Sequence, residues 1–155
     1  MVTNDIEELI ARLSAIPVRI AQAVEDLDAT QLAVVATGEE WSVQDIMAHM
    51  RASCDILVYR LYAVLVRNEP VVLAYDGRVW AQVARYAHAD FQSALSEYML
   101  RRVALVDMLQ HLAPDDWKRI GIHEINGPRS LQHMALALLE HEEEHCTQIE
   151  MLCRG

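Results

Sequence analysis

Glycine, proline, cysteine and phenylalanine are all scarce in this chain. Five Gly and four Pro in 155 residues are too few for a loop-rich β fold. No uncharged apolar run is long enough to span a bilayer, so we expect no membrane partner. The three cysteines show no tight spacing pattern. An odd, unpatterned set indicates reduced thiols, and we therefore expect a cytoplasmic protein.

Basic residues are also in short supply. The 13 Lys and Arg are outnumbered by 23 Asp and Glu, and the formal net charge is −10. Phosphate backbones are bound by clusters of Lys and Arg, so nucleic acid is not expected as a partner.

Hydrophobic residues make up 53% of the chain, which is enough for a full core. The length suits a single domain over residues 1–155.

Apolar residues recur with a helical period in the first half of the chain. Residues 4–30 predict one helix, which Pro17 should kink or split. A second helix should begin at Ser42, because Asp45 three residues later resembles a capping box. This helix should end near Arg67, before an Asn-Glu-Pro sequence.

The second half predicts two further helices. Residues 78–113 are largely helical in pattern, with a break where Asp90 can cap a fresh start. Residues 115–129 form a long connection with an Asn-Gly-Pro turn, and Ser130 caps the last helix. Four long amphipathic helices predict an all-α fold, a four-helix bundle.

Two histidines stand one turn apart on the last predicted helix. His141 and His145 share a face with the apolar Leu138 and Ile149, at about 100° per residue. Buried imidazoles need polar partners, and one metal ion can supply them to both rings. Two core histidines that hydrogen-bond to neighbouring groups are the alternative interpretation.

His49 is the natural third ligand. It lies roughly 10 Å from the start of its helix, and His145 lies roughly 12 Å from the end of the last helix. The two residues come level only if these helices are antiparallel, which requires one long crossover in the bundle. Residues 68–77 and residues 114–129 are both long enough to form it.

Three neutral imidazoles leave open coordination positions, as catalytic metal sites do. Nitrogen ligands suit zinc or nickel, with iron as an alternative, better than magnesium or calcium. Such a metal activates a bound water or a bound thiol.

Glu142 is a candidate general base or a partner that orients His141, and a solvated carboxylate is the alternative. Ser53, one turn after His49, either lines the cavity or merely packs.

Three segments together resemble the DinB-like (DinB/YfiT) superfamily. The likeness extends from the first helix to the final turn, and a Trp-Ser-Val-x5-His segment joined to a C-terminal His-x3-His is more specific than either half. The segments are Trp41–Met50, Gly127–Leu131 and His141–Ile149.

This resemblance implies an up-down-down-up bundle with the long crossover between the second and third helices. It also implies a divalent metal held by His49, His141 and His145, and a homodimer. Family members include transferases and isomerases that use low-molecular-weight thiols, and metal-dependent hydrolases. We therefore expect a small-molecule substrate and a thiol-dependent transferase or isomerase. A hydrolase, and a non-catalytic bundle that binds a metal or a small ligand, are the alternatives.

Aliphatic residues outside the expected core faces also favour a homodimer, because surplus apolar surface needs cover. These residues are Met47, Cys54, Val58 and Leu65 on the second helix, and Leu136 and Leu139 on the last.

Overall fold

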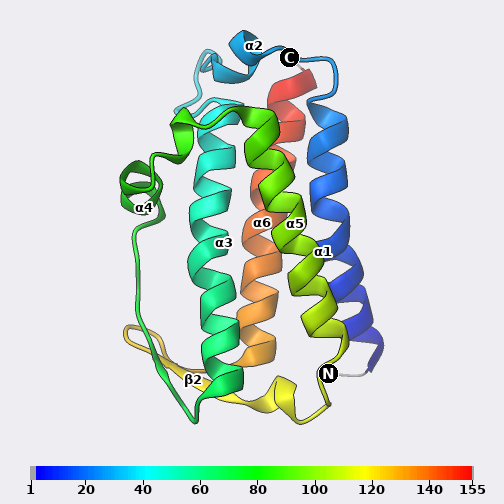
Figure 1. Cartoon of the computed structure of the whole chain (residues 1–155), viewed down its shortest axis with the longest axis vertical. Helices are drawn as coiled ribbons and strands as arrows, with labels where there is room; N and C mark the ends of the chain where they lie inside the picture. The colour runs from blue at the N-terminus through cyan, green and yellow to red at the C-terminus, as the bar shows by residue number, and fades with distance from the viewer. Residues whose placement is uncertain (1–2, 155) are drawn as a thin grey trace.

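The computed structural model describes residues 3–154, so both ends of the expected domain, residues 1–2 and 155, lie outside the described part. Four long helices form a bundle (Figure 1). The first and last helices run in one direction and the middle two run in the other, which confirms the up-down-down-up four-helix bundle. The four helices are α1 (Thr3–Ala23), α3 (Val43–Val66), α5 (Phe91–Gln110) and α6 (Leu131–Arg154).

The long crossover joins α3 to α5. It rises along the outside of the bundle and carries a two-residue strand, a short α-helix and one 3-10 turn (Figure 1). Of the two expected positions, the one that begins at residue 68 is therefore correct. The crossover elements are β1 (Val71–Val72), α4 (Gly77–Val83) and η1 (Tyr86–His88).

The predicted helix starts are confirmed by their hydrogen bonds. The backbone N–H of Asp45 donates to Ser42 Oγ over 3.1 Å, and the N–H of Ser42 donates to Asp45 Oδ2 over 3.0 Å. The carboxylate of Asp90 accepts from Ser93 N at the start of α5. Each cap gives a partner to an N–H group that the first helical turn leaves free.

The predicted first helix differs from the structure at Pro17 and at its end. Pro17 lies inside α1, which the structure assigns as one continuous helix, so the expected split is wrong. Asp28 does not end α1, which stops at Ala23. Instead it caps the short helix α2 (Ala29–Ala33), because its side chain accepts from Gln31 N while Gln31 reaches back to Asp28 N.

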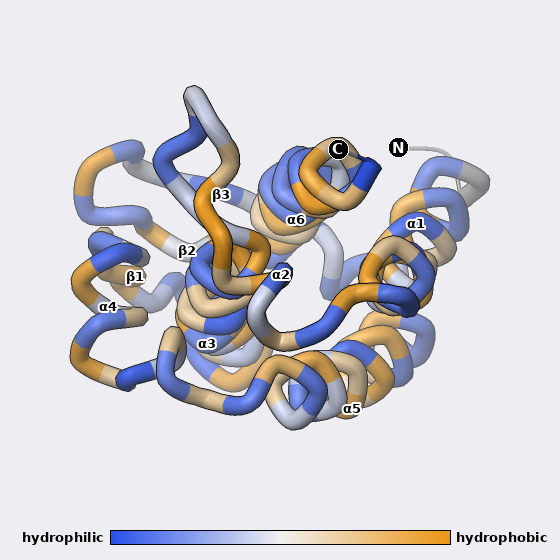
Figure 2. The backbone as a smooth tube through the Cα atoms, turned by 90° about the horizontal axis from the view of Figure 1, so that it is seen from above, coloured by the Kyte–Doolittle hydropathy of each residue, from blue (hydrophilic) through white to orange (hydrophobic). Residues whose placement is uncertain are grey.

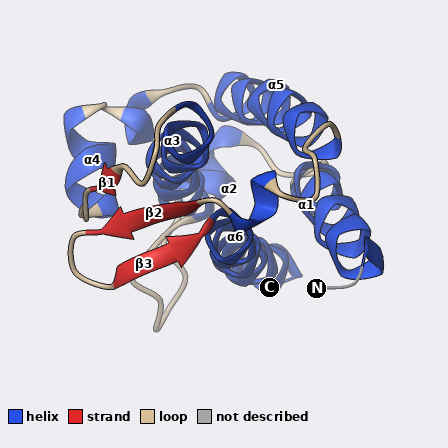
Figure 3. Ribbon diagram, turned by 90° about the horizontal axis from the view of Figure 1, so that it is seen from below, coloured by secondary structure: helices blue, strands red, loops and turns tan. Residues whose placement is uncertain are grey.

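A small sheet at one end of the bundle was not predicted. The hairpin of β2 (Ile120–His123) and β3 (Gly127–Ser130) follows the 3-10 turn η2 (Asp116–Lys118) and lies beside α3 and α6 (Figure 3). Strand β1 pairs with β2 in parallel. Strands of two to four residues carry too little alternation to be recognised in a sequence.

The core lies between the four long helices, along which hydrophobic and hydrophilic residues alternate (Figure 2). Met47, Cys54 and Leu139 are buried, so the expectation that they supply free surface is wrong. Neighbouring elements cover more than one face of α3 and α6. No helix within residues 3–154 has the length and hydropathy needed to cross a membrane.

Candidate metal centre

Three histidines from two helices converge near one end of the bundle. His49 comes from α3, and His141 and His145 come from the antiparallel α6. Their potential ligand atoms all lie within 4.8 Å of one another. The ring centroids of His141 and His145 are 4.6 Å apart, and the His49 centroid lies 4.8 Å from that of His145 and 5.2 Å from that of His141. The three residues that the sequence analysis selected are therefore neighbours in space.

Hydrogen bonds orient two of the rings. Gln148 Oε1 lies 3.2 Å from His145 Nδ1 and accepts its proton, which leaves a lone pair on Nε2 of His145. Ser53 is fully buried, and its Oγ lies 3.0 Å from His141 Nε2 and 3.4 Å from His49 Nε2. This geometry therefore favours the interpretation that Ser53 lines the site at the histidines over the interpretation that it merely packs.

The electrostatics of the cluster keep two of its rings neutral. The pKa of His49 is lowered to about 4, mainly by burial and in part because two other imidazoles stand beside it, where a second positive charge is unfavourable. Burial also lowers the pKa of His141 to about 4. A neutral imidazole is the form that binds a metal. Within the described residues, His49 Nδ1 is buried without a hydrogen-bond partner, so this atom has an unused lone pair or proton.

The crossover and the chain before α3 cover the histidines. The Trp41 ring lies 5.0 Å from His49 and 5.9 Å from His145, between centroids. A Cβ at Gly77 would lie only 2.8 Å from His49 Cε1, so this close approach requires glycine. Arg78 lies over the outer side of Trp41, 4.8 Å from the ring centroid.

Sequence reasoning missed this cover. The sequence favours Trp41 as a packing residue at the start of the second helix rather than a substrate contact, and the Asp-Gly pair at residues 76–77 as a turn or a cap. The glycine was the available signal, because a glycine at the start of a helix can mark a close backbone approach. Nothing in a single sequence indicated that the close neighbour was His49.

Glu142 faces away from the histidines towards α5. Its side chain is fully buried, and its Oε2 accepts from Tyr98 Oη over 2.8 Å and from Arg102 Nη2. The interpretation of Glu142 as a solvated carboxylate is therefore wrong. Burial raises the pKa of Glu142, while the charge of Arg102 opposes this rise. Its role as a general base stays a prediction.

Two aromatic residues of the crossover and two buried cysteines serve the packing around the site. Trp80 Nε1 and Tyr86 Oη both donate to Asp55 Oδ2, over 3.0 and 2.6 Å, and so tie the crossover to α3. Burial raises the pKa of Cys54 to about 12 and that of Cys146 to about 11. Both thiols are therefore protonated at neutral pH, as expected of packing residues rather than nucleophiles.

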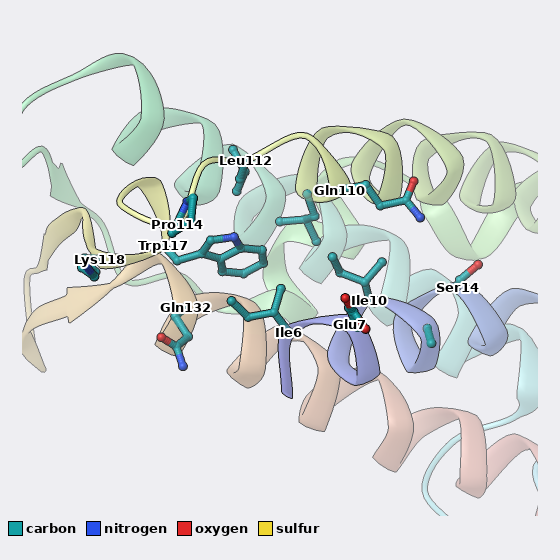
Figure 4. Close-up of a pocket in the computed structure, with 12 residues that line it drawn as sticks. Ile6, Glu7, Ile10, Ser14, Gln110, Leu112, Pro114, Trp117, Lys118 and Gln132 are labelled. Atoms are coloured by element: carbon teal, nitrogen blue, oxygen red, sulfur yellow. The ribbon is translucent and has the colours of Figure 1, made fainter. Parts of the chain in front are cut away.

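A cavity of about 720 Å³ lies far from the histidines, where α1 begins and α5 ends. Figure 4 shows the indole of Trp117 in its wall, near Ile6 and Ile10. Its lining is mainly apolar and contains none of the histidines. The nitrogen donors that a transition metal needs are therefore gathered at the other end of the bundle.

Comparison with known proteins agrees with this geometry. The sequence profile of the DinB superfamily matches residues 7–149. The chain belongs to the DinB superfamily. The resemblance of its three sequence segments to this family is thereby confirmed.

Relatives in the superfamily are described as metal-dependent. Two proteins of Oceanobacillus iheyensis, each named a putative metal-dependent hydrolase, are 25% and 22% identical over 96% of this chain, which spans 86% and 85% of their lengths. The solved structure of YfiT from Bacillus subtilis superposes with a TM-score of 0.88 at 22% identity, covering 99% of this chain and 89% of that one. It is described as a probable metal-dependent hydrolase with an unusual four-helix bundle topology. Its likeness to this DinB protein shows the fold.

The residues of the cluster fit a divalent transition metal. The cluster offers three imidazole nitrogens, and two of the rings are held neutral by burial. The buried Nδ1 of His49 without a partner is the kind of orphaned polar atom that a bound ion or a closing ring movement would satisfy. The cluster contains no carboxylate from the described residues, which favours a nitrogen-preferring metal over magnesium or calcium.

Proposed function

We propose that this DinB-superfamily protein is a metal-dependent enzyme whose divalent transition metal is held by His49, His141 and His145. The observation that carries the proposal is the convergence of three imidazoles whose ligand atoms lie within 4.8 Å of one another. Three protein ligands leave coordination positions for a nucleophile and a substrate. Zinc and nickel are the metals that this donor set favours, and iron is the alternative.

A metal held by these histidines would lower the pKa of a coordinated water or thiol, and so would supply the nucleophile of a hydrolase or of a thiol-dependent transferase or isomerase. The side chains of the protein orient and shield this site. Gln148 holds the His145 ring through Nδ1, and Ser53 Oγ lies within hydrogen-bond reach of whatever group approaches His141 and His49. Trp41 and Gly77 cover the rings and limit the access of water.

The names of the relatives favour hydrolysis. A different observation favours thiol transfer: within residues 3–154, no carboxylate joins the cluster as a base, and Glu142 is engaged by Tyr98 and Arg102. A thiol held at these three histidines through a metal would need no separate protein base, because the ion would lower the pKa of the thiol. Thiol-dependent transfer or isomerisation is therefore the second candidate.

The experiment is a turnover assay on protein loaded with zinc or nickel. A panel of esters, amides and soft electrophiles is supplied with and without low-molecular-weight thiols. Turnover that needs the thiol indicates a transferase or isomerase, and turnover without it indicates a hydrolase. His145→Ala is the matched variant, and it should lose both the metal and the activity. A wild-type protein that holds no metal would refute the proposal, whereas one that binds metal without any turnover would support the non-catalytic bundle.

A further inference from the structure

A second, smaller cavity lies between α3, α6 and the β2–β3 hairpin. Its volume is about 140 Å³, which suits one small chemical group rather than a whole substrate. Its walls include Leu57 and Arg60 from α3, His123 and Arg129 from the hairpin, and Ala137 from α6. Positive and hydrogen-bonding side chains therefore surround a space with an aliphatic floor.

This cavity adjoins the histidine cluster along the same pair of helices. Ser53 of α3 contacts His141 of α6 at 3.0 Å. Leu57 lies four residues after Ser53, Ala137 lies four residues before His141, and both line the cavity. Because α3 and α6 are antiparallel, four residues forward on α3 and four residues back on α6 lead in the same direction along the bundle. The cavity is thus about one helical turn, roughly 5.4 Å, from the Ser53–His141 contact.

Arg60 is a buried cation with an unused donor. Its exposed fraction is 8%, and its guanidinium lies 5.0 Å from the Tyr75 ring centroid. One nitrogen, Nη2, donates to the carbonyl oxygen of Leu73. Its Nε is buried and has no hydrogen-bond partner among the described residues. A buried, charged group with a free donor is costly unless an acceptor binds it.

Arg129 adds a second cation. Its Nη1 donates to the carbonyl oxygen of Pro128 over 2.9 Å. In the described part of the chain neither Arg60 nor Arg129 forms an ion pair, although the net charge of the protein is −10. Burial lowers the pKa of Arg60, and the exposed Glu124 opposes this shift without forming such a pair. Two positive charges thus lack a negative partner at the cavity.

His123 supplies a neutral donor beside them. Its Nδ1 lies 3.2 Å from Ile125 N and 3.3 Å from Asn126 N, and accepts from these backbone N–H groups. Its Nε2 therefore carries the proton. Burial lowers the pKa of His123, and the positive charge of Arg60 lowers it further, so the ring is neutral at pH 7. The site thus combines two guanidinium groups and an imidazole N–H.

We propose that this cavity binds the anionic end of the substrate, a carboxylate or a phosphate, while the reactive end lies at the histidine cluster. Two guanidinium groups match the oxygens of either anion. This inference rests on the proposed function, because it assigns the cavity and the metal centre to one elongated site. It also predicts the class of substrate: a small molecule whose anionic group lies on the order of 5–11 Å from its reacting atom, the length of about one to two helical turns.

The first test uses metal-free protein and inorganic phosphate as the probe. In NMR spectra of the wild type, the amide resonances of residues 123–133 should shift as phosphate is added. These shifts should become smaller at high salt, because salt screens the attraction between the anion and the arginines. Arg129→Gln should abolish these shifts, and Arg60→Lys should reduce them. Arg67→Gln removes the same charge from an exposed position outside the cavity and should behave as the wild type. Shifts that are absent in the wild type, or unchanged in Arg129→Gln, would overturn the proposal. Replacing phosphate by acetate distinguishes the two anions.

The second test uses metal-loaded protein and compares the monohydroxamate of suberic acid with its methyl ester. Both carry a metal-binding hydroxamate, but only the acid carries an anion at the far end. The acid should bind about tenfold more tightly, and Arg129→Gln should remove this advantage. Equal affinities would refute the shared site. Acetohydroxamate binds through the metal alone, so its failure to bind would count against the proposed function. In that case the phosphate titration alone would test the cavity.

Discussion

The Oγ atom of Ser53 on α3 lies 3.0 Å from the Nε2 atom of His141 on α6, although 88 residues separate them in the chain. This contact joins the two halves of the histidine cluster. It also lies about one helical turn from Leu57 and Ala137, which line the small cavity together with Arg60 and Arg129. A change at Ser53 therefore tests the centre of the proposed site without removing a ligand.

Ser53→Ala should weaken metal binding without unfolding the bundle. The variant deletes a hydroxyl that contacts two candidate ligands, and loss of such a partner costs about 10–100-fold in metal affinity. Competition with a chelating dye measures the dissociation constant, and circular dichroism checks the helices. Ser93→Ala, at the start of α5, changes the same chemical group far from the cluster and serves as the control. Equal metal affinity in Ser53→Ala and the wild type would contradict the assignment.

Gly77→Ala should disturb the metal centre through His49. The new Cβ would lie 2.8 Å from His49 Cε1 and must push the ring or the crossover aside. We expect metal affinity to fall about tenfold, while helix propensity at this position favours alanine by up to about 1 kcal/mol. Gln82→Ala, exposed on the same short helix, is the control. Unaltered metal binding together with raised stability would show that the His49 ring has room to move.

Glu142 and Arg102 should be strongly coupled in stability. Glu142→Leu leaves the Arg102 charge buried and unpaired, which should cost about 3–5 kcal/mol in the free energy of unfolding. The double variant Glu142→Leu/Arg102→Met should recover much of this loss, and urea denaturation measures both. If Glu142 is also a general base, Glu142→Gln should keep metal binding but lose the acidic limb of the pH–rate profile. Additive losses in the double variant would contradict the coupling.

The metal-free protein should lose stability as the pH falls from about 6.5 to about 4. His49 has an ordinary pKa of 6.5 in the unfolded chain and about 4 in the folded one, and His141 behaves alike. The unfolded state therefore binds protons first, so acid favours unfolding over this window, and the contribution is fully present only above pH 6.5. His49→Gln should show a shallower decline than the wild type. The variant His111→Gln, at an exposed position, should decline as the wild type does. Identical slopes of stability against pH for all three proteins would refute the shifted pKa values.

The homodimer stays a prediction that a mass measurement tests. Several large apolar side chains on α3 and α5 are exposed, including Tyr59 at 64%, Leu100 at 73% and Val103 at 68%. A twofold contact would repeat this face on both subunits and cover it. Light scattering at micromolar concentration should give about twice 17.6 kDa. A mass of 17.6 kDa would mean a monomer, and Val103→Lys should shift a dimer towards that mass.

The amino-acid sequence by itself determined the four long helices, their capped starts and the identity of the three clustered histidines. These features depend on local physics: the period of apolar residues, the hydroxyl of Ser42 and the carboxylate of Asp90 at helix starts, and the i, i+4 spacing of His141 and His145. Residue positions along the helices showed that His49 and His145 come level if their helices are antiparallel, and the family resemblance implied that arrangement.

The residues alone left two connections able to cross the bundle, and the family resemblance implied the one between the second and third helices, which the structure confirms. Only the tertiary structure decided that Glu142 faces Arg102, and that Gly77 and Trp41 cover the histidines. It also decided that Arg60 and Arg129 meet beside the cluster. These relationships join residues far apart in the chain, and no local periodicity encodes them. They arise because packing four amphipathic helices sets their rotation and register, and this brings distant side chains to the same depth.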